Sequence, residues 1–140
     1  MPEPAIRTAA LGAVEPNRRR GGDIRVVLGP KTVGATTGFL GVVALQPGEF
    51  VAEHYHPYSE EFVYVTRGVL SLRIGADTVR LSAGEGTVVP IGARHRSHND
   101  GAEPAEAVFH LCPLAPRPEL GHVDTEALPD PVAAQLTVGG

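Results

Sequence analysis

The chain has 140 residues, a mass of 14.7 kDa and a formal net charge of −4 at pH 7, which together predict one domain large enough for a core and a lined cavity. The acidic balance argues against a nucleic-acid binder, and the sequence has no apolar stretch of about 18 residues that would span a membrane. Its single cysteine, Cys112, excludes an internal disulfide and a C-x-x-C site, so we expect a cytoplasmic protein.

Short apolar runs separated by turn residues predict an all-β sandwich or barrel. Leu70, Leu72 and Ile74 alternate with Ser71 and Arg73, which is typical of a strand with one buried face. Strands are expected near 23–29, 36–46, 49–56, 60–66, 69–75, 77–82, 86–90, 94–98 and 104–112. The sequence shows no long helical pattern.

The flanks of the chain differ from its centre in composition. We expect an N-terminal arm over 1–22, a barrel over 23–112, and a proline-rich tail over 113–140 that packs on the barrel or on a partner. Arg18–Arg20 are interpreted as a solvated loop, and His122 in the tail as solvated. A short turn of helix is conceivable only near 124–136, where Pro129 and Pro131 interrupt it.

Three histidines have a spacing that suits a metal site. His54 and His56 lie two apart on a predicted strand, so both rings point to the same face. Glu61 follows on the next strand, after the bend at Pro57. His95 begins a later strand, after the turn at Pro90–Gly92, and it can complete a three-histidine set. Imidazole and carboxylate together suit zinc, iron, manganese, nickel or copper.

These residues fall in two motifs that resemble a known superfamily. Residues 48–68 read G-x5-H-x-H-x4-E-x6-G, and residues 84–99 read G-x5-P-x-G-x2-H-x3-N. Both resemble the signature motifs of the cupin superfamily. The resemblance implies a double-stranded β-helix, or jelly roll, that holds one divalent metal ion per chain, with His54, His56, Glu61 and His95 as ligands. It also implies a homodimer paired through sheet edges.

The fourth ligand has alternatives. Glu60 would replace Glu61 if the loop were one residue shorter, but the spacing to Gly68 favours Glu61. His110 lies in the middle of a predicted strand, where an inward imidazole needs a partner. It is a candidate fourth ligand, a candidate proton carrier beside the metal, or a hydrogen-bonded core residue. Glu61 and His110 are the candidate catalytic bases, and His98 is expected on the outer face.

A narrower resemblance extends into the tail. Residues 54–68 and 109–123 are similar to the small cupin cyclases of bacterial aromatic polyketide pathways, of the tetracenomycin and resistomycin type. The resemblance implies aldol-type cyclisation and aromatisation of a poly-β-ketone delivered by an acyl carrier protein, with zinc favoured and iron, manganese or nickel as alternatives. An Fe(II) dioxygenase and a non-catalytic ligand-binding cupin are the rival functions.

Overall fold

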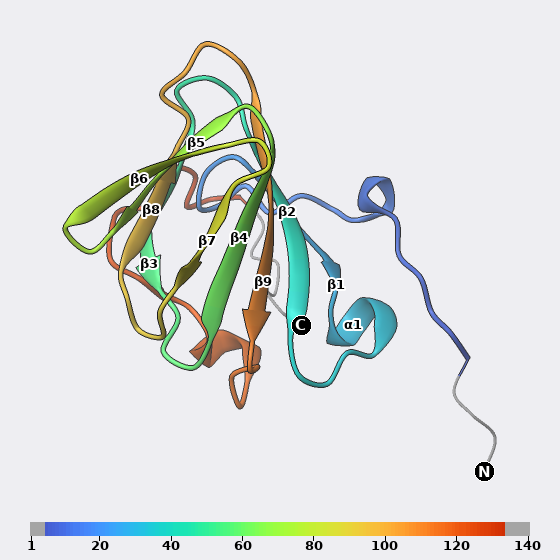
Figure 1. Ribbon diagram of the computed structural model, residues 1–140. Coiled ribbons are helices and arrows are strands. Elements are labelled where there is room, and N and C mark those ends of the chain that lie inside the picture. Colours follow the sequence, from blue (N-terminus) through green and yellow to red (C-terminus); the bar gives the residue numbers. More distant parts are fainter. Residues whose placement is uncertain (1–4, 134–140) are drawn as a thin grey trace.

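The alternating segments form two antiparallel sheets in a computed structural model of the chain, which describes residues 5–133 (Figure 1). The first sheet has the order β1 (Asp23–Leu28), β2 (Phe39–Leu45), β9 (Ala105–Cys112), β4 (Glu60–Arg67), β7 (Gly86–Val89). The second has the order β10 (Val123–Asp124), β3 (Phe50–Tyr55), β8 (His95–His98), β5 (Val69–Ile74), β6 (Asp77–Ser82). The predicted all-β jelly roll is confirmed, and β10 is the strand that the sequence did not predict.

Among the described residues, helical structure is confined to single turns. The α-helix α1 (Pro30–Val33) begins at a proline, whose fixed φ suits the first helical position, and the Gly29 N–H donates to Thr32 Oγ1 at 3.0 Å. Two 3-10 turns, η1 (Leu11–Ala13) and η2 (Pro118–Leu120), flank the barrel. Residues 124–133 hold no helix, so that expectation is wrong there, and 134–136 lie outside the described residues. No helix within residues 5–133 is long and apolar enough to cross a membrane.

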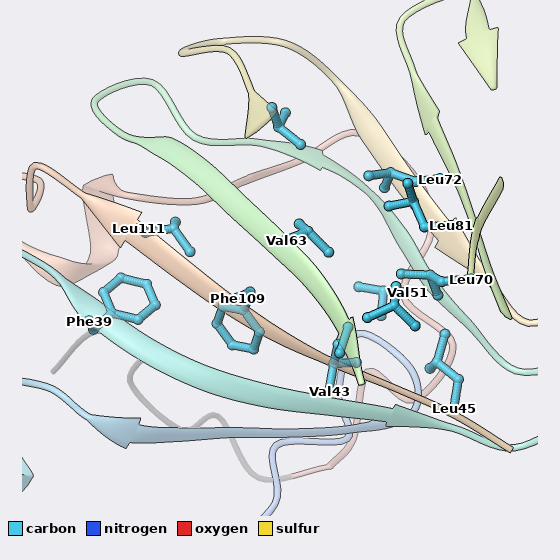
Figure 2. Packing of buried hydrophobic residues seen from close by; sticks show 13 residues of the cluster. Phe39, Val43, Leu45, Val51, Val63, Leu70, Leu72, Leu81, Phe109 and Leu111 are labelled. Carbon is cyan, nitrogen blue, oxygen red and sulfur yellow. The ribbon is translucent and has the colours of Figure 1, made fainter. Parts of the chain in front are cut away.

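The core lies between the two sheets, where side chains from both inner faces meet (Figure 2). On β9 every second residue is buried, and on β4 the buried Val63 and Val65 alternate with exposed neighbours. Phe39 and Phe109 pack edge to face, with ring centroids 6.4 Å apart. The core therefore forms one apolar interior, and several of its residues also line the cavity that contains the polar site described below.

A β-bulge in β3 sets the direction of the first histidine. Val51 pairs with Ser97 and His54 pairs with His95, so three steps along β3 match two steps along β8. In a regular strand Val51 and His54 would point to opposite faces. The extra residue lets both side chains face the barrel interior, so His54 is buried on the same side as Val51 and does not point to solvent.

The segment before β1 joins the two sheets. Asn17 exchanges backbone hydrogen bonds with Ile24 of β1, and the Arg20 carbonyl accepts the Ala52 N–H of β3 at 2.9 Å. Gly21 has a φ of +106°, and a Cβ there would lie 1.9 Å from the Phe50 carbonyl oxygen, so only glycine fits. The interpretation of Arg18–Arg20 as a solvated loop is wrong for Arg20, which is 8% exposed because this crossing turns it inward.

Part of the proline-rich tail returns to the second sheet. Val123 pairs with Tyr55 and Asp124 pairs with His54, which places β10 along the free edge of β3. The Thr125 N–H donates to the Glu53 carbonyl at 3.0 Å and extends this contact. The predicted domain boundaries at 22/23 and 112/113 stay predictions, but residues 121–124 are thereby brought to the histidine cluster.

Candidate metal centre

Four side chains from three strands and their ends converge in the interior of the barrel. His54 lies on β3, His56 directly after it, Glu61 near the start of β4, and His95 at the start of β8. One potential ligand atom from each lies within 4.8 Å of the other three. The three histidines are 3–7% exposed, so the cluster is sheltered from solvent. The structure thus brings together the four residues that the sequence predicted as ligands.

Backbone carbonyls fix the orientation of all three rings. Nδ1 of His54 lies 2.7 Å from the Ala52 oxygen, Nδ1 of His95 lies 2.9 Å from the Ala93 oxygen, and Nδ1 of His56 lies 2.8 Å from the Gly121 oxygen. A ring that donates its Nδ1–H to a carbonyl keeps a lone pair on Nε2, as a metal ligand requires. The tail carbonyl of Gly121 therefore orients one of the candidate ligands.

Two of the buried histidine nitrogens in the cluster lack a hydrogen-bond partner of good geometry among the described residues. Glu61 Oε2 lies 2.7 Å from His95 Nε2 and 3.6 Å from His56 Nε2. Even so, neither buried nitrogen has a hydrogen bond of acceptable geometry within residues 5–133. Buried polar atoms without partners are costly, and a cation between them would satisfy both nitrogens. Three imidazoles and one carboxylate therefore fit a single divalent ion of the zinc, iron, manganese or nickel type.

Burial and ion pairing set the protonation of the cluster. Burial lowers the pKa of His54 well below its usual range, so the ring is neutral and able to bind a metal. Burial alone would raise the pKa of Glu61, but His56 and His95 outweigh it and hold this pKa well below the usual range. Burial would likewise lower the pKa of His95, but the Glu61 carboxylate raises it overall. In the protein chain alone, Glu61 and His95 form a buried ion pair.

A second polar group, which sequence reasoning missed, adjoins the cluster. The His122 ring stacks on His54, with centroids 4.2 Å apart and planes 14° apart. Its Nε2 lies 2.7 Å from Arg20 Nε and 2.8 Å from Asp124 Oδ1. The interpretation of His122 as solvated is wrong, because β10 folds against β3 and leaves its side chain 9% exposed. The H-x-D pattern of residues 122–124, with period 2, was the available signal.

His110 does not join the cluster. It belongs to the half-buried face of β9, opposite to Phe109 and Leu111, and it pairs with the exposed Phe62 of β4 at a ring separation of 6.1 Å. Glu61, and not the alternative His110, lies with the three histidines as the candidate fourth ligand. Glu60 is exposed on the outer face of β4, so it does not replace Glu61 either.

The cluster lines a cavity of about 70 Å³ inside the barrel. Val43, Val63, Leu72, Phe109 and Leu111 supply much of its apolar wall. At roughly 30 Å³ of liquid volume per water molecule, this space holds about two of them, so it admits a small part of a long ligand. A groove of about 370 Å³ between α1 and the tail shares Leu111 and His122 with the cavity and offers space for the remainder.

The buried histidines predict a loss of stability in acid for the metal-free protein. Burial lowers the pKa of His122 to about 2, so below pH 6.5 the unfolded chain takes up a proton that the folded chain refuses. Between pH 7 and pH 5 this costs about 2 kcal/mol of unfolding free energy. In urea unfolding with a chelator present, the unfolding free energy of His122→Gln should therefore fall by about 2 kcal/mol less between pH 7 and pH 5 than that of the wild type. Equal losses in both proteins would contradict the assignment.

Comparisons with known proteins agree with this geometry. Residues 41–111 match the family described as the Cupin domain. Polyketide synthase CurC of Streptomyces cyaneus is 56% identical over 121 residues, covering 86% of this chain and 79% of the relative. Tetracenomycin polyketide synthase protein TcmJ of Streptomyces glaucescens is 52% identical over 136 residues, covering 97% and 91%.

The fold also matches solved structures at low sequence identity. The crystal structure of a protein of Thermotoga maritima described as a predicted oxalate decarboxylase superposes with a TM-score of 0.67 at 20% identity, covering 76% of this chain and 99% of the other. At this identity the likeness concerns the fold alone. On the evidence of the matched residues, the two-sheet barrel and the relatives above, this chain belongs to the cupin family.

Proposed function

We propose that this protein is a metal-dependent cyclase that catalyses aldol-type cyclisation and aromatisation of a poly-β-ketone in aromatic polyketide biosynthesis. The observation that carries the proposal is the buried three-histidine, one-glutamate cluster that lines a largely apolar cavity. The names of the relatives, a polyketide synthase and a tetracenomycin polyketide synthase protein, support the substrate class.

The chemistry of the substrate explains why such a site is useful. A poly-β-ketone has acidic methylenes and electrophilic carbonyls, so it closes many wrong rings without guidance. When bound, a divalent cation would polarise a carbonyl oxygen as a Lewis acid. Val63, Phe109 and Leu111 give the cavity an apolar wall, and a bound chain that displaces water there would strengthen every charge interaction inside it. The small volume limits the reacting segment to a short stretch of chain, with the remainder in the adjoining groove.

The predicted catalytic roles of Glu61 and His110 differ in their support. Glu61 lines the cavity, and its carboxylate lies beside His56 and His95, where it would complete the ligand set. Its strongly lowered pKa makes it a weak base, so its role as a ligand is the better supported of the two. His110 contacts Phe62 on the opposite face of β9 and takes no part in the proposed reaction.

The proposal is tested by supplying a nascent polyketide to the protein as isolated, stripped of metal, and reloaded with zinc, iron, manganese or nickel. We expect one cyclised aromatic product to dominate only with metal-loaded protein, as read by chromatography with mass spectrometry. A product distribution that is the same with stripped and loaded protein would reject the cyclase. Oxygen uptake that depends on iron would instead support the dioxygenase, and binding without turnover would support the ligand-binding alternative.

Delivery by an acyl carrier protein, a homodimer and a cytoplasmic location stay predictions. The groove between α1 and the tail offers a route for a tethered chain, because it shares His122 with the inner cavity. Lys31, the single lysine of the sequence, lines this groove, where its charge suits an acidic carrier.

A further inference from the structure

Arg20 is a buried cation that the proposed metal chemistry does not use. Only 8% of the residue is exposed, and it lines the same cavity as the four candidate ligands. The bond from Ala52 to its carbonyl and the close approach of Gly21 to Phe50 fix its backbone against β3. Its position is therefore built into the fold, and the side chain cannot swing freely into solvent.

The contacts of the guanidinium group leave its buried Nη1 atom without a partner in the described part of the chain. Arg20 Nε lies 2.7 Å from His122 Nε2 and 3.3 Å from Asp124 Oδ1. Neutral His122 accepts this hydrogen bond, and Asp124 supplies one countercharge. Nη1 is buried and has no hydrogen-bond partner within residues 5–133. Because a buried charged donor is costly when unpaired, this atom calls for an acceptor oxygen from outside the chain.

The surroundings of Arg20 indicate what that acceptor is. His122, which accepts from Arg20, stacks on His54, so a single ring separates the guanidinium from the candidate metal centre. Arg20 and the four cluster residues line the same cavity, so a ligand inside it meets both a positive charge and the cluster. A 1,3-dicarbonyl in its enolate form carries negative charge spread over two oxygens, so it offers an acceptor to the guanidinium and a second one to the cluster.

We propose that Arg20 binds a charged oxygen of the enolate form of a 1,3-dicarbonyl through Nη1, while the second oxygen faces the cluster of His54, His56, Glu61 and His95. This inference rests on the proposed function, because a poly-β-ketone is a chain of such units. Arg20 selects the enolate over the neutral diketone, since a charge-assisted hydrogen bond is stronger than a neutral one. The N-terminal segment thereby contributes to substrate recognition.

Binding of pentane-2,4-dione to the zinc-loaded protein tests the proposal by titration calorimetry. We expect Arg20→Gln to weaken binding about 10- to 100-fold at unchanged zinc content. The matched control is Arg18→Gln, which removes a neighbouring exposed arginine paired with Asp23 and should bind as the wild type does. Equal affinity of wild type and Arg20→Gln at full zinc content would overturn the proposal.

Further arms keep the result interpretable. Arg20→Gln leaves the Asp124 carboxylate without its ion-pair partner and could therefore fold poorly. In that case the double variant Arg20→Gln/Asp124→Asn removes the unpaired carboxylate as well. Its control is Asp124→Asn alone, which keeps the guanidinium group. Acetate that binds as tightly as the dione, with the same dependence on Arg20, would show a general anion site and overturn the assignment to dicarbonyls. If the dione binds in a way that depends on Arg20 but the protein shows no cyclising activity, the cyclase proposal would be rejected and the dicarbonyl site at Arg20 would be supported.

Discussion

Replacing His95 with alanine is expected to reduce bound metal from one ion per chain to a small fraction of that. His95 supplies one of four converging ligand atoms, and its ring is 3% exposed and held by the Ala93 carbonyl. Removing it leaves an incomplete set that opens into the cavity, so the ion loses both a bond and its closed geometry. Cyclisation should fall to the level of metal-stripped protein.

The same strand offers the matched control. His98 lies three residues further along β8, half-buried and outside the cluster. His98→Ala should keep both the metal content and the product profile of the wild type. Elemental analysis after dialysis against micromolar zinc measures the stoichiometry, and far-UV circular dichroism verifies that both variants fold. Full metal occupancy in folded His95→Ala would exclude His95 as a ligand.

The inward-facing part of the site could be predicted because it depends on local periodicity. Two histidines two apart on a strand share a face whatever the rest of the fold does, and Glu61 shares its face with Val63 and Val65. The turn at Pro90–Gly92 leads into the strand that begins at His95, as expected. The bulge in β3 was not predictable, yet it is what lets Val51 and His54 face inward together.

The remaining parts of the site depend on contacts between distant segments. Arg20 reaches the cavity only because residues 17–22 cross from β1 to β3, and His122 only because β10 pairs with β3. The crossing of residues 17–22 leaves no periodic signal in the sequence, and β10 leaves only the three-residue H-x-D pattern, so both side chains were interpreted as solvent-exposed. The face of His110 was ambiguous because Val108 and Phe109 are both apolar, and the pairing of Phe62 with His110 settles it.

Glu61→Gln is expected to have the second large effect, and it separates charge from shape. Gln keeps the size of the side chain but removes the negative charge that Glu61 brings to the ligand set. Metal affinity should fall by more than the roughly 10- to 100-fold typical of outer-shell partners, because a direct ligand is weakened. Competition with a chelator of known affinity measures the change, and Glu60→Gln, on the exposed face of β4, is the control.

The metal-free protein gives an independent readout of the same substitution. The Glu61 carboxylate raises the pKa of His95 against the opposing effect of burial. Without that carboxylate, burial is opposed only by the weaker raising effects of the Ala93 carbonyl and Glu53, so the pKa of His95 should fall relative to the wild type in Glu61→Gln and stay raised in Glu60→Gln. Titration of the imidazole nitrogens by NMR follows both. An unchanged His95 titration in Glu61→Gln would mean that the two side chains do not form the pair on which the four-ligand arrangement depends.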